Sequence, residues 1–170
     1  MQGHDKIGSP TLPRKLGRYY DDFTVGDVYE HRPGRTITES DNTWFTLLTM
    51  NTHPLHFDKE YAAKSEFKRP LVNSCLTLSM VVGMSVSDVS QKAIANLGWN
   101  DIRLIAPVFV GDTICAESVV LSTRASAKRP TQGIVTVQTS GKKADDTLFM
   151  TYERSVLVPM RGHAVDDRAG

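Results

Sequence analysis

Apolar and polar positions divide the chain into a helical first half and a strand-like second half. Residues 20–90 carry helical patterns, whereas residues 97–159 alternate with the period of two that is typical of half-buried strands. Turn residues such as Gly111-Asp112 and Asp145-Asp146 separate successive runs. The pattern predicts strands over 102–110, 113–121, 133–139 and 148–158.

One segment of the first half is apolar on nearly all sides. Over residues 71–89 apolar side chains occupy most of a helical circumference, and the polar interruptions are small. A helix with this pattern is expected to be buried. An antiparallel sheet wrapped around one long central helix, an α+β arrangement, is the simplest packing of these parts.

An amphipathic helix is predicted before this segment, over residues 39–50. Its apolar face carries Trp44, Leu47 and Leu48. The helix cannot continue far beyond this point, because Pro54 biases the residue before it away from helical geometry. The chain therefore leaves the helix in a break that precedes the buried segment.

Length and charge favour one ordinary domain. The 170 residues suit a single domain over 18–160, with tails over 1–17 and 161–170 that lack periodicity. The net charge of +1 offers no phosphate-neutralising surface, so a nucleic-acid partner is not expected. The chain shows neither the apolar core of a signal peptide nor a run that could span a bilayer. We expect a cytoplasmic protein without a membrane partner.

Chemically useful side chains gather in the break, which reads NTHPLHFD over residues 51–58. His56 is the candidate proton carrier, because histidine ordinarily titrates near neutral pH. Asn51 can orient a water molecule or bind a carbonyl group, but it cannot act as a base. Asp58 could orient the imidazole, or it could cap a short helix over 59–63.

Each of these residues also has an ordinary structural interpretation. A loop histidine is commonly a hydrogen-bonded structural residue, and asparagine is common at the C-terminal end of a helix. The pair His53 and His56 could suggest a metal site, but one nearby carboxylate does not complete the ligand set of a zinc ion. No metal is therefore expected.

The break resembles the signature of MaoC-like dehydratases and (R)-specific enoyl-CoA hydratases, roughly G-D-x-N-P-x-H-x-D followed by a small residue. The sequence FTVGD at 23–27 resembles the opening of that family, and PVFVGDT at 107–113 resembles its strand-turn-strand. Residues 71–83 fall where the family has its central helix. The resemblance covers about residues 19–160 and implies a single hot-dog fold.

Two positions depart from the family pattern. Asn51 stands where the family has the aspartate that works with the histidine, and His53 stands where it has asparagine. The resemblance implies hydration of a 2-enoyl-CoA thioester or dehydration of a 3-hydroxyacyl-CoA, with His56 as the principal acid/base. Asn51 would position the water or a substrate carboxylate. The pattern is similar to the mesaconyl-CoA hydratase-like branch, which implies a branched or carboxylated acyl-CoA of four or five carbons.

The resemblance also implies how the thioester is bound. Backbone N–H groups near the start of the central helix would polarise the thioester carbonyl, which makes Asn73 and Ser74 candidate substrate-binding residues. N-terminal capping is the ordinary alternative for both. His53 and Asp58 are further candidates for substrate binding.

Coenzyme A is part of the substrate, so no separate cofactor is expected. Surface cations are mostly only solvated, but some could bind the phosphates of coenzyme A. The candidates are Arg103, Arg124, Lys128 and Arg129. The family also implies self-association, as a homodimer or a dimer-based hexamer with the site across the dimer interface.

Two other functions remain open. A hot-dog acyl-CoA thioesterase would need a carboxylate to activate water, and only Asp58 or Glu66 could serve. A non-catalytic acyl-CoA-binding subunit would explain why Asn51 replaces an acidic partner, because catalytic groups are commonly tuned as pairs.

Overall fold

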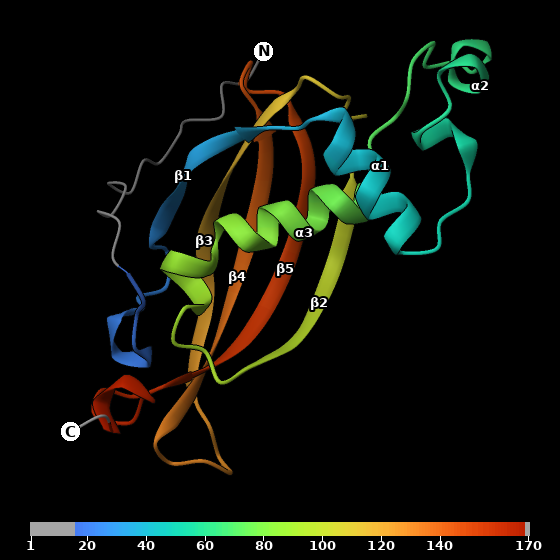
Figure 1. Ribbon diagram of the computed structural model, residues 1–170. Coiled ribbons are helices and arrows are strands. Elements are labelled where there is room, and N and C mark those ends of the chain that lie inside the picture. Colours follow the sequence, from blue (N-terminus) through green and yellow to red (C-terminus); the bar gives the residue numbers. More distant parts are fainter. Residues whose placement is uncertain (1–15, 169–170) are drawn as a thin grey trace, which may run out of the picture.

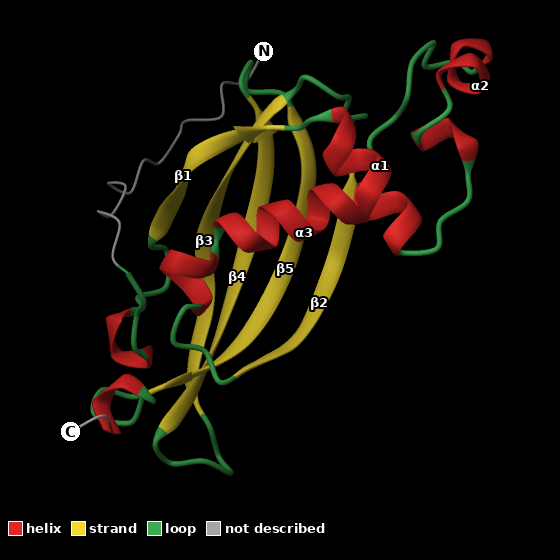
Figure 2. Ribbon diagram, viewed as in Figure 1, coloured by secondary structure: helices red, strands yellow, loops and turns green. Residues whose placement is uncertain are grey.

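Five strands form one antiparallel sheet, and a single helix lies across one face of it (Figure 1). The computed structural model describes residues 16–168. The strand order is β1-β3-β4-β5-β2, so that β1 and β2 are the two edges. The strands are β1 (Val28–Thr36), β2 (Ala95–Leu104), β3 (Thr113–Ala125), β4 (Gln132–Lys143) and β5 (Leu148–Pro159). The predicted α+β arrangement of a sheet around a central helix is confirmed (Figure 2).

The central helix α3 spans Ser74–Met84 and is shorter than the predicted 71–89. Before it, Leu71 pairs with Phe109 in an isolated β-bridge. After it, the chain widens into a π-helical turn over Val86–Ser90. The apolar pattern continues through both flanks because they are packed in the same core, so it could not mark where the helix begins and ends.

The hydrophobic core lies between α3 and the sheet. Leu76 and Val81 of α3 are buried in it, whereas Cys75 on another side of the helix is exposed. The helix is therefore buried along one side only, although its sequence is apolar on nearly all sides. The strands contribute Ile114, Phe149 and Tyr152 at one end of the core and Val120, Val135 and Val156 at the other.

The predicted strand over 102–110 is wrong in its position, because β2 occupies Ala95–Leu104 instead. Residues 105–110 form an irregular segment. Its Val108 accepts a hydrogen bond of 2.9 Å from the N–H of Val72, which connects this segment to the residues before α3. As an edge strand, β2 is exposed along nearly its whole length and lacks alternating burial. Its Gly and Asn residues are also unfavourable in strands, so the sequence pattern does not indicate a strand at these positions.

Two helices precede α3, α1 over Glu39–Leu48 and α2 over Lys59–Lys64. In Figure 1, α1 lies near the β2 edge of the sheet and α2 lies farther out on the same side. Both agree with the predicted helices. The orientation of α1 is unexpected, because its buried face carries the polar residues Asn42 and Thr46. Its apolar face points outward, with Trp44 76% exposed and Leu48 81% exposed.

Buried polar side chains form a network inside the core. The carboxylate of Asp88 lies 3.0 Å from Arg18 and 3.1 Å from Nδ1 of His31. A carboxylate only accepts hydrogen bonds, so Nδ1 of His31 carries the proton. The other ring nitrogen lies 2.7 Å from the hydroxyl of Ser118, which in turn lies 2.8 Å from that of Thr139.

The sequence predicts a tail over 161–170, whereas residues 161–167 pack against the start of the domain. Arg161 forms an ion pair of 2.6 Å with Asp22, and the hydroxyl of Tyr19 donates a hydrogen bond of 2.6 Å to Asp167. Such polar contacts leave no periodic apolar signal. Of the predicted N-terminal tail, residues 1–15 lie outside the described residues. Within residues 16–168, no helix is long and apolar enough to cross a membrane.

Candidate active site

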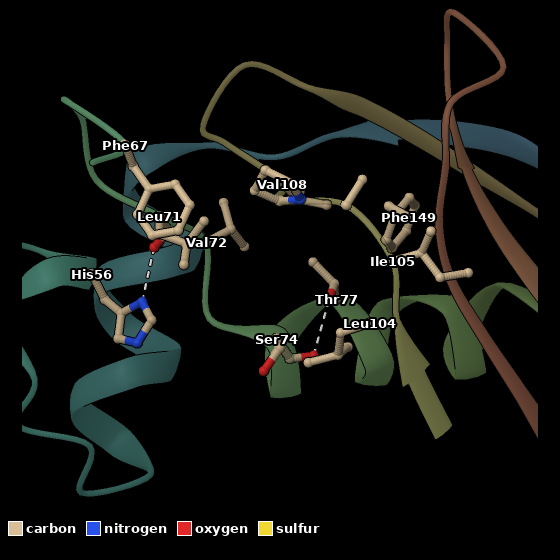
Figure 3. Close-up of a pocket in the computed structure, with 12 residues that line it drawn as sticks. His56, Phe67, Leu71, Val72, Ser74, Thr77, Leu104, Ile105, Val108 and Phe149 are labelled. Carbon is tan, nitrogen blue, oxygen red and sulfur yellow. Dashed lines mark hydrogen bonds between the residues drawn. The ribbon is translucent and has the colours of Figure 1, made fainter. Parts of the chain in front are cut away.

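His56 lines a hollow of about 320 Å³ at the end of the sheet where β2 ends and β5 begins. Its walls come from the segment before α3, the first turn of α3 and the irregular segment after β2 (Figure 3). Most of the walls are apolar, which suits an acyl chain. The lining residues are His56, Phe67, Leu71, Val72, Ser74, Thr77, Leu104, Ile105, Ala106, Pro107, Val108 and Phe149.

One hydrogen bond fixes the protonation pattern of the His56 ring. His56 ends a short 3₁₀ turn over Pro54–His56, and its Nδ1 lies 2.9 Å from the carbonyl oxygen of Leu71. A carbonyl oxygen only accepts, so Nδ1 donates and Nε2 of the neutral ring keeps its lone pair. Figure 3 shows Nε2 directed away from Leu71, where it can accept a proton.

Asn42 of α1 connects the His56 turn to the start of α3. It is 1% exposed, and its amide nitrogen donates to the carbonyl oxygens of His56 at 2.7 Å and Leu71 at 3.1 Å. Its amide oxygen accepts a hydrogen bond of 2.9 Å from the N–H of Asn73. Its side-chain donors and acceptor are therefore used to hold two backbone segments together beside the hollow, the His56 turn and the residues just before α3.

The first turn of α3 lies at the wall of the hollow, which Ser74 and Thr77 line. Asn73 is the N-cap, and its side chain accepts a hydrogen bond of 2.9 Å from the N–H of Cys75. The N–H of Ser74, the first helical residue, has no acceptor among residues 16–168. Figure 3 shows His56 and Ser74 on different walls of the hollow. The positive end of the helix dipole at this point favours negative charge.

The other residues predicted from the motif make local contacts. The side-chain oxygen of Asn51 accepts a hydrogen bond of 3.0 Å from the N–H of His53, and Nδ1 of His53 accepts one of 3.1 Å from Leu55. Asp58 caps α2 by accepting from the N–H of Tyr61 at 3.0 Å. None of the residues Asn51, His53 and Asp58 lines the His56 hollow. Their catalytic or binding roles stay predictions.

The four cationic residues predicted to bind phosphate lie in two separate parts of the structure. Arg124, Lys128 and Arg129 surround a hollow of about 390 Å³ near the start of β2 and the end of β5, which is the opposite end of both strands from His56. Arg103 instead forms an exposed ion pair of 2.7 Å with Asp101. The role of all four in binding coenzyme A stays a prediction.

Sequence reasoning missed two residues near His56. Asn42 carries no motif, and the only signal for it is a polar residue on one side of an amphipathic helix. Arg69 lines a second hollow, of about 180 Å³, that shares His56 with the first. Glu66, the carboxylate that a thioesterase would need, is exposed and lines neither hollow.

Comparisons with known proteins show that the chain is similar to hydratases. A mesaconyl-CoA hydratase of Haloarcula marismortui is 31% identical over 156 residues, which are 91% of this chain and 43% of that protein. An (R)-specific enoyl-CoA hydratase of Aeromonas caviae is 32% identical over 115 residues, which are 68% of this chain and 81% of that protein.

A solved structure identifies the fold by name. A Mycobacterium tuberculosis protein described as having a double hotdogfold matches with a TM-score of 0.79, covering 88% of this chain and 47% of that one. At 24% identity this likeness concerns the fold alone.

The length of the match also differs between relatives. The chain spans less than half the length of the mesaconyl-CoA hydratases that it matches. A family model described as mesaconyl-CoA hydratase nevertheless matches residues 6–170, which is almost the whole chain. The protein therefore has a hot-dog fold and belongs to the mesaconyl-CoA hydratase family.

Proposed function

We propose that the His56 hollow catalyses the reversible addition of water to a 2-enoyl-CoA thioester. The observation that carries this proposal is that one apolar hollow is lined both by His56, whose Nε2 keeps its lone pair, and by Ser74, whose N–H has no acceptor among the described residues. The first group suits a base, and the second suits a carbonyl oxygen that becomes negative. The hydratases among the relatives support the same reaction class.

One histidine can carry the whole proton balance of this reaction. Nε2 of His56 takes a proton from water while the water oxygen bonds to C3 of the enoyl group. The electrons of the C2–C3 double bond move to the thioester oxygen, where the N–H of Ser74 and the start of α3 stabilise them. His56 then returns the proton to C2. No second side chain has to gain or lose a proton, so Asn51 does not block the chemistry.

The finer substrate assignment is a short acyl-CoA that carries a free carboxylate, as in mesaconyl-CoA. The family model and the mesaconyl-CoA hydratases among the relatives support it. The substrate would bring coenzyme A with it, so the reaction needs no further organic group.

Two copies of the chain are proposed to act together. The outward apolar face of α1 and the unpaired edge of β2 are surfaces that a second copy would cover. Relatives of more than twice this length and a structure with two hot-dog units in one chain support such a pair. Assembly of dimers into a hexamer stays a prediction.

The decisive experiment offers crotonyl-CoA and mesaconyl-CoA to the purified chain. Loss of the ultraviolet absorbance of the enoyl thioester, without release of thiol, supports hydration. Release of free coenzyme A, detected by a thiol reagent, would replace hydration with thioester hydrolysis. Unchanged absorbance with both substrates, despite measurable binding, would mark a non-catalytic acyl-CoA-binding subunit.

A further inference from the structure

The second hollow beside His56 differs in chemistry from the first. It holds about 180 Å³ and lies against the segment that connects α2 to α3. The first hollow is mainly apolar, whereas this one brings three charged side chains to His56. Its lining residues are Glu39, His56, Phe57, Lys59, Arg69, Pro70 and Val110. A substrate that contacts His56 can therefore also lie against the charged side chains of the second hollow.

One charge in the second hollow has no counter-charge. Lys59 and Glu39 neutralise each other in an ion pair of 2.9 Å. Arg69 has no carboxylate partner in the described part of the chain. The second hollow thus has a net positive charge, which comes from Arg69.

The guanidinium of Arg69 is held in place by an aromatic ring. Its central carbon lies 3.8 Å from the ring centroid of Phe109, which is itself buried. Stacking of this kind uses the flat face of the guanidinium and leaves the N–H groups at its rim free to bind an anion. These groups match the geometry of a carboxylate, which accepts two parallel hydrogen bonds.

The proposed reaction places a substrate carboxylate on this side of His56. In mesaconyl-CoA the free carboxylate is bonded to C3, the carbon that receives the water. With the thioester at Ser74 in the first hollow and C3 at His56, the carboxylate on C3 would point away from Ser74. The second hollow, which His56 also lines, offers a space for this carboxylate.

We propose that Arg69 binds the free carboxylate of a carboxylated 2-enoyl-CoA and thereby selects this substrate over uncarboxylated ones. This inference rests on the proposed hydratase function. It makes Arg69 a specificity-determining residue, whereas His56 performs the proton transfers on either kind of substrate.

A matched substrate pair tests the proposal. Mesaconyl-CoA with its methyl group on C2 is compared with 2-methylbut-2-enoyl-CoA, in which a methyl group replaces the carboxylate. The measured quantity is the ratio of the two kcat/KM values. We expect Arg69→Gln to lower this ratio by about 10- to 100-fold, the range for hydrogen bonds to a charged group. Arg69→Lys, which keeps the charge without the two-pronged geometry, should lower it less. The neighbouring exposed Lys68→Gln should leave the ratio and both rates unchanged.

Each outcome of the comparison is decisive. If Arg69→Gln lowers both kcat/KM values equally, Arg69 binds the phosphates of coenzyme A or supports the fold, and the proposal is overturned. An unchanged ratio overturns it as well. If the wild-type chain hydrates crotonyl-CoA but not mesaconyl-CoA, the Arg69 proposal fails while the hydratase function stands. If the wild type hydrates none of the three thioesters, the proposed function itself fails. Thermal unfolding of each variant checks that the fold is intact.

Discussion

The side-chain amide of Asn42 donates a hydrogen bond of 2.7 Å to the main-chain carbonyl of His56. The same amide nitrogen donates to the carbonyl of Leu71, which also receives the hydrogen bond from the ring of His56. One buried residue of α1 thus sets the position of the His56 backbone and of the acceptor that orients its imidazole. In the proposed reaction Asn42 touches no substrate and acts through His56, as a positioning residue.

Replacing Asn42 should therefore damage both stability and activity. Asn42→Asp removes both donors and places a carboxylate at a buried position beside two carbonyl oxygens. The carbonyl of His56 loses its side-chain donor and that of Leu71 keeps only the His56 ring, so the free energy of unfolding should fall by at least about 2 kcal/mol. The turnover number should fall too, because the His56 turn loses its anchor. Urea unfolding and hydration kinetics measure the two effects.

Asn51→Asp is the matched control for that experiment. Asn51 uses only its side-chain oxygen, in one local hydrogen bond to His53, and an aspartate keeps this acceptor. Its free energy of unfolding should stay within about 0.5 kcal/mol of the wild type. Equal losses in the two variants would show that the network around Asn42 has no special importance.

His56→Ala should remove most of the hydratase activity. Loss of a general acid/base ordinarily costs about a hundred- to ten-thousand-fold in rate. The fall should appear in kcat/KM for every enoyl-CoA that the chain hydrates, because the proton transfers do not depend on the acyl substituent. His163→Ala, at an exposed histidine near the C-terminus, should retain the wild-type rate. Near-wild-type rates for His56→Ala would refute the mechanism.

Self-association should depend on the outward face of α1. Leu48→Glu places a charge on this face and should shift the chain toward the monomer in sedimentation equilibrium, because burying an unpaired charge is unfavourable. Val165→Glu is the control, since Val165 is similarly exposed, at 83%, but lies near the C-terminus. A monomeric wild-type chain, or an unchanged association constant in Leu48→Glu, would rule out this interface.

Stability should decrease under mildly acidic conditions because of His31. Its side chain is 0% exposed, and burial lowers the pKa of its imidazole below the ordinary value. As the pH falls through about 6.5, the unfolded chain takes up a proton that the folded chain does not. The free energy of unfolding should therefore decrease by up to about 1.4 kcal/mol per pH unit until the folded imidazole is also protonated.

Denaturant titrations between neutral and mildly acidic pH measure this effect. His31→Gln removes the titrating group, so its stability should depend less on pH over this interval, whatever its absolute stability. A decline as steep as that of the wild type would assign the acid sensitivity to other groups.

The strands show which parts of a fold a sequence can reveal. β3, β4 and β5 alternate because each has one buried face, and their positions could be predicted. β2 is an edge strand without alternating burial, and it was misplaced by several residues. The pattern of α1 correctly separated apolar from polar positions. It could not show that the polar side is the buried one, because an amphipathic pattern separates two faces of a helix without showing which face packs against the rest of the chain.

A site residue could be predicted from the sequence only where its residue type suits the chemistry and it also lies in a recognisable motif. His56 could be identified because its residue type and its motif agree, and the structure places it in a hollow with Ser74. Asn42 and Arg69 come from segments outside the motif and reach His56 only through the tertiary fold. No local pattern could have connected them.

The carbonyl oxygen that orients the His56 ring belongs to the main chain of Leu71. Every amino acid offers this acceptor, so the tautomer of the histidine does not depend on which side chain occupies position 71. Relatives can therefore vary this position to reshape the acyl hollow without losing the proton carrier. At position 71 the side chain can change the substrate range while the main chain keeps the hydrogen bond on which the proposed proton transfer depends.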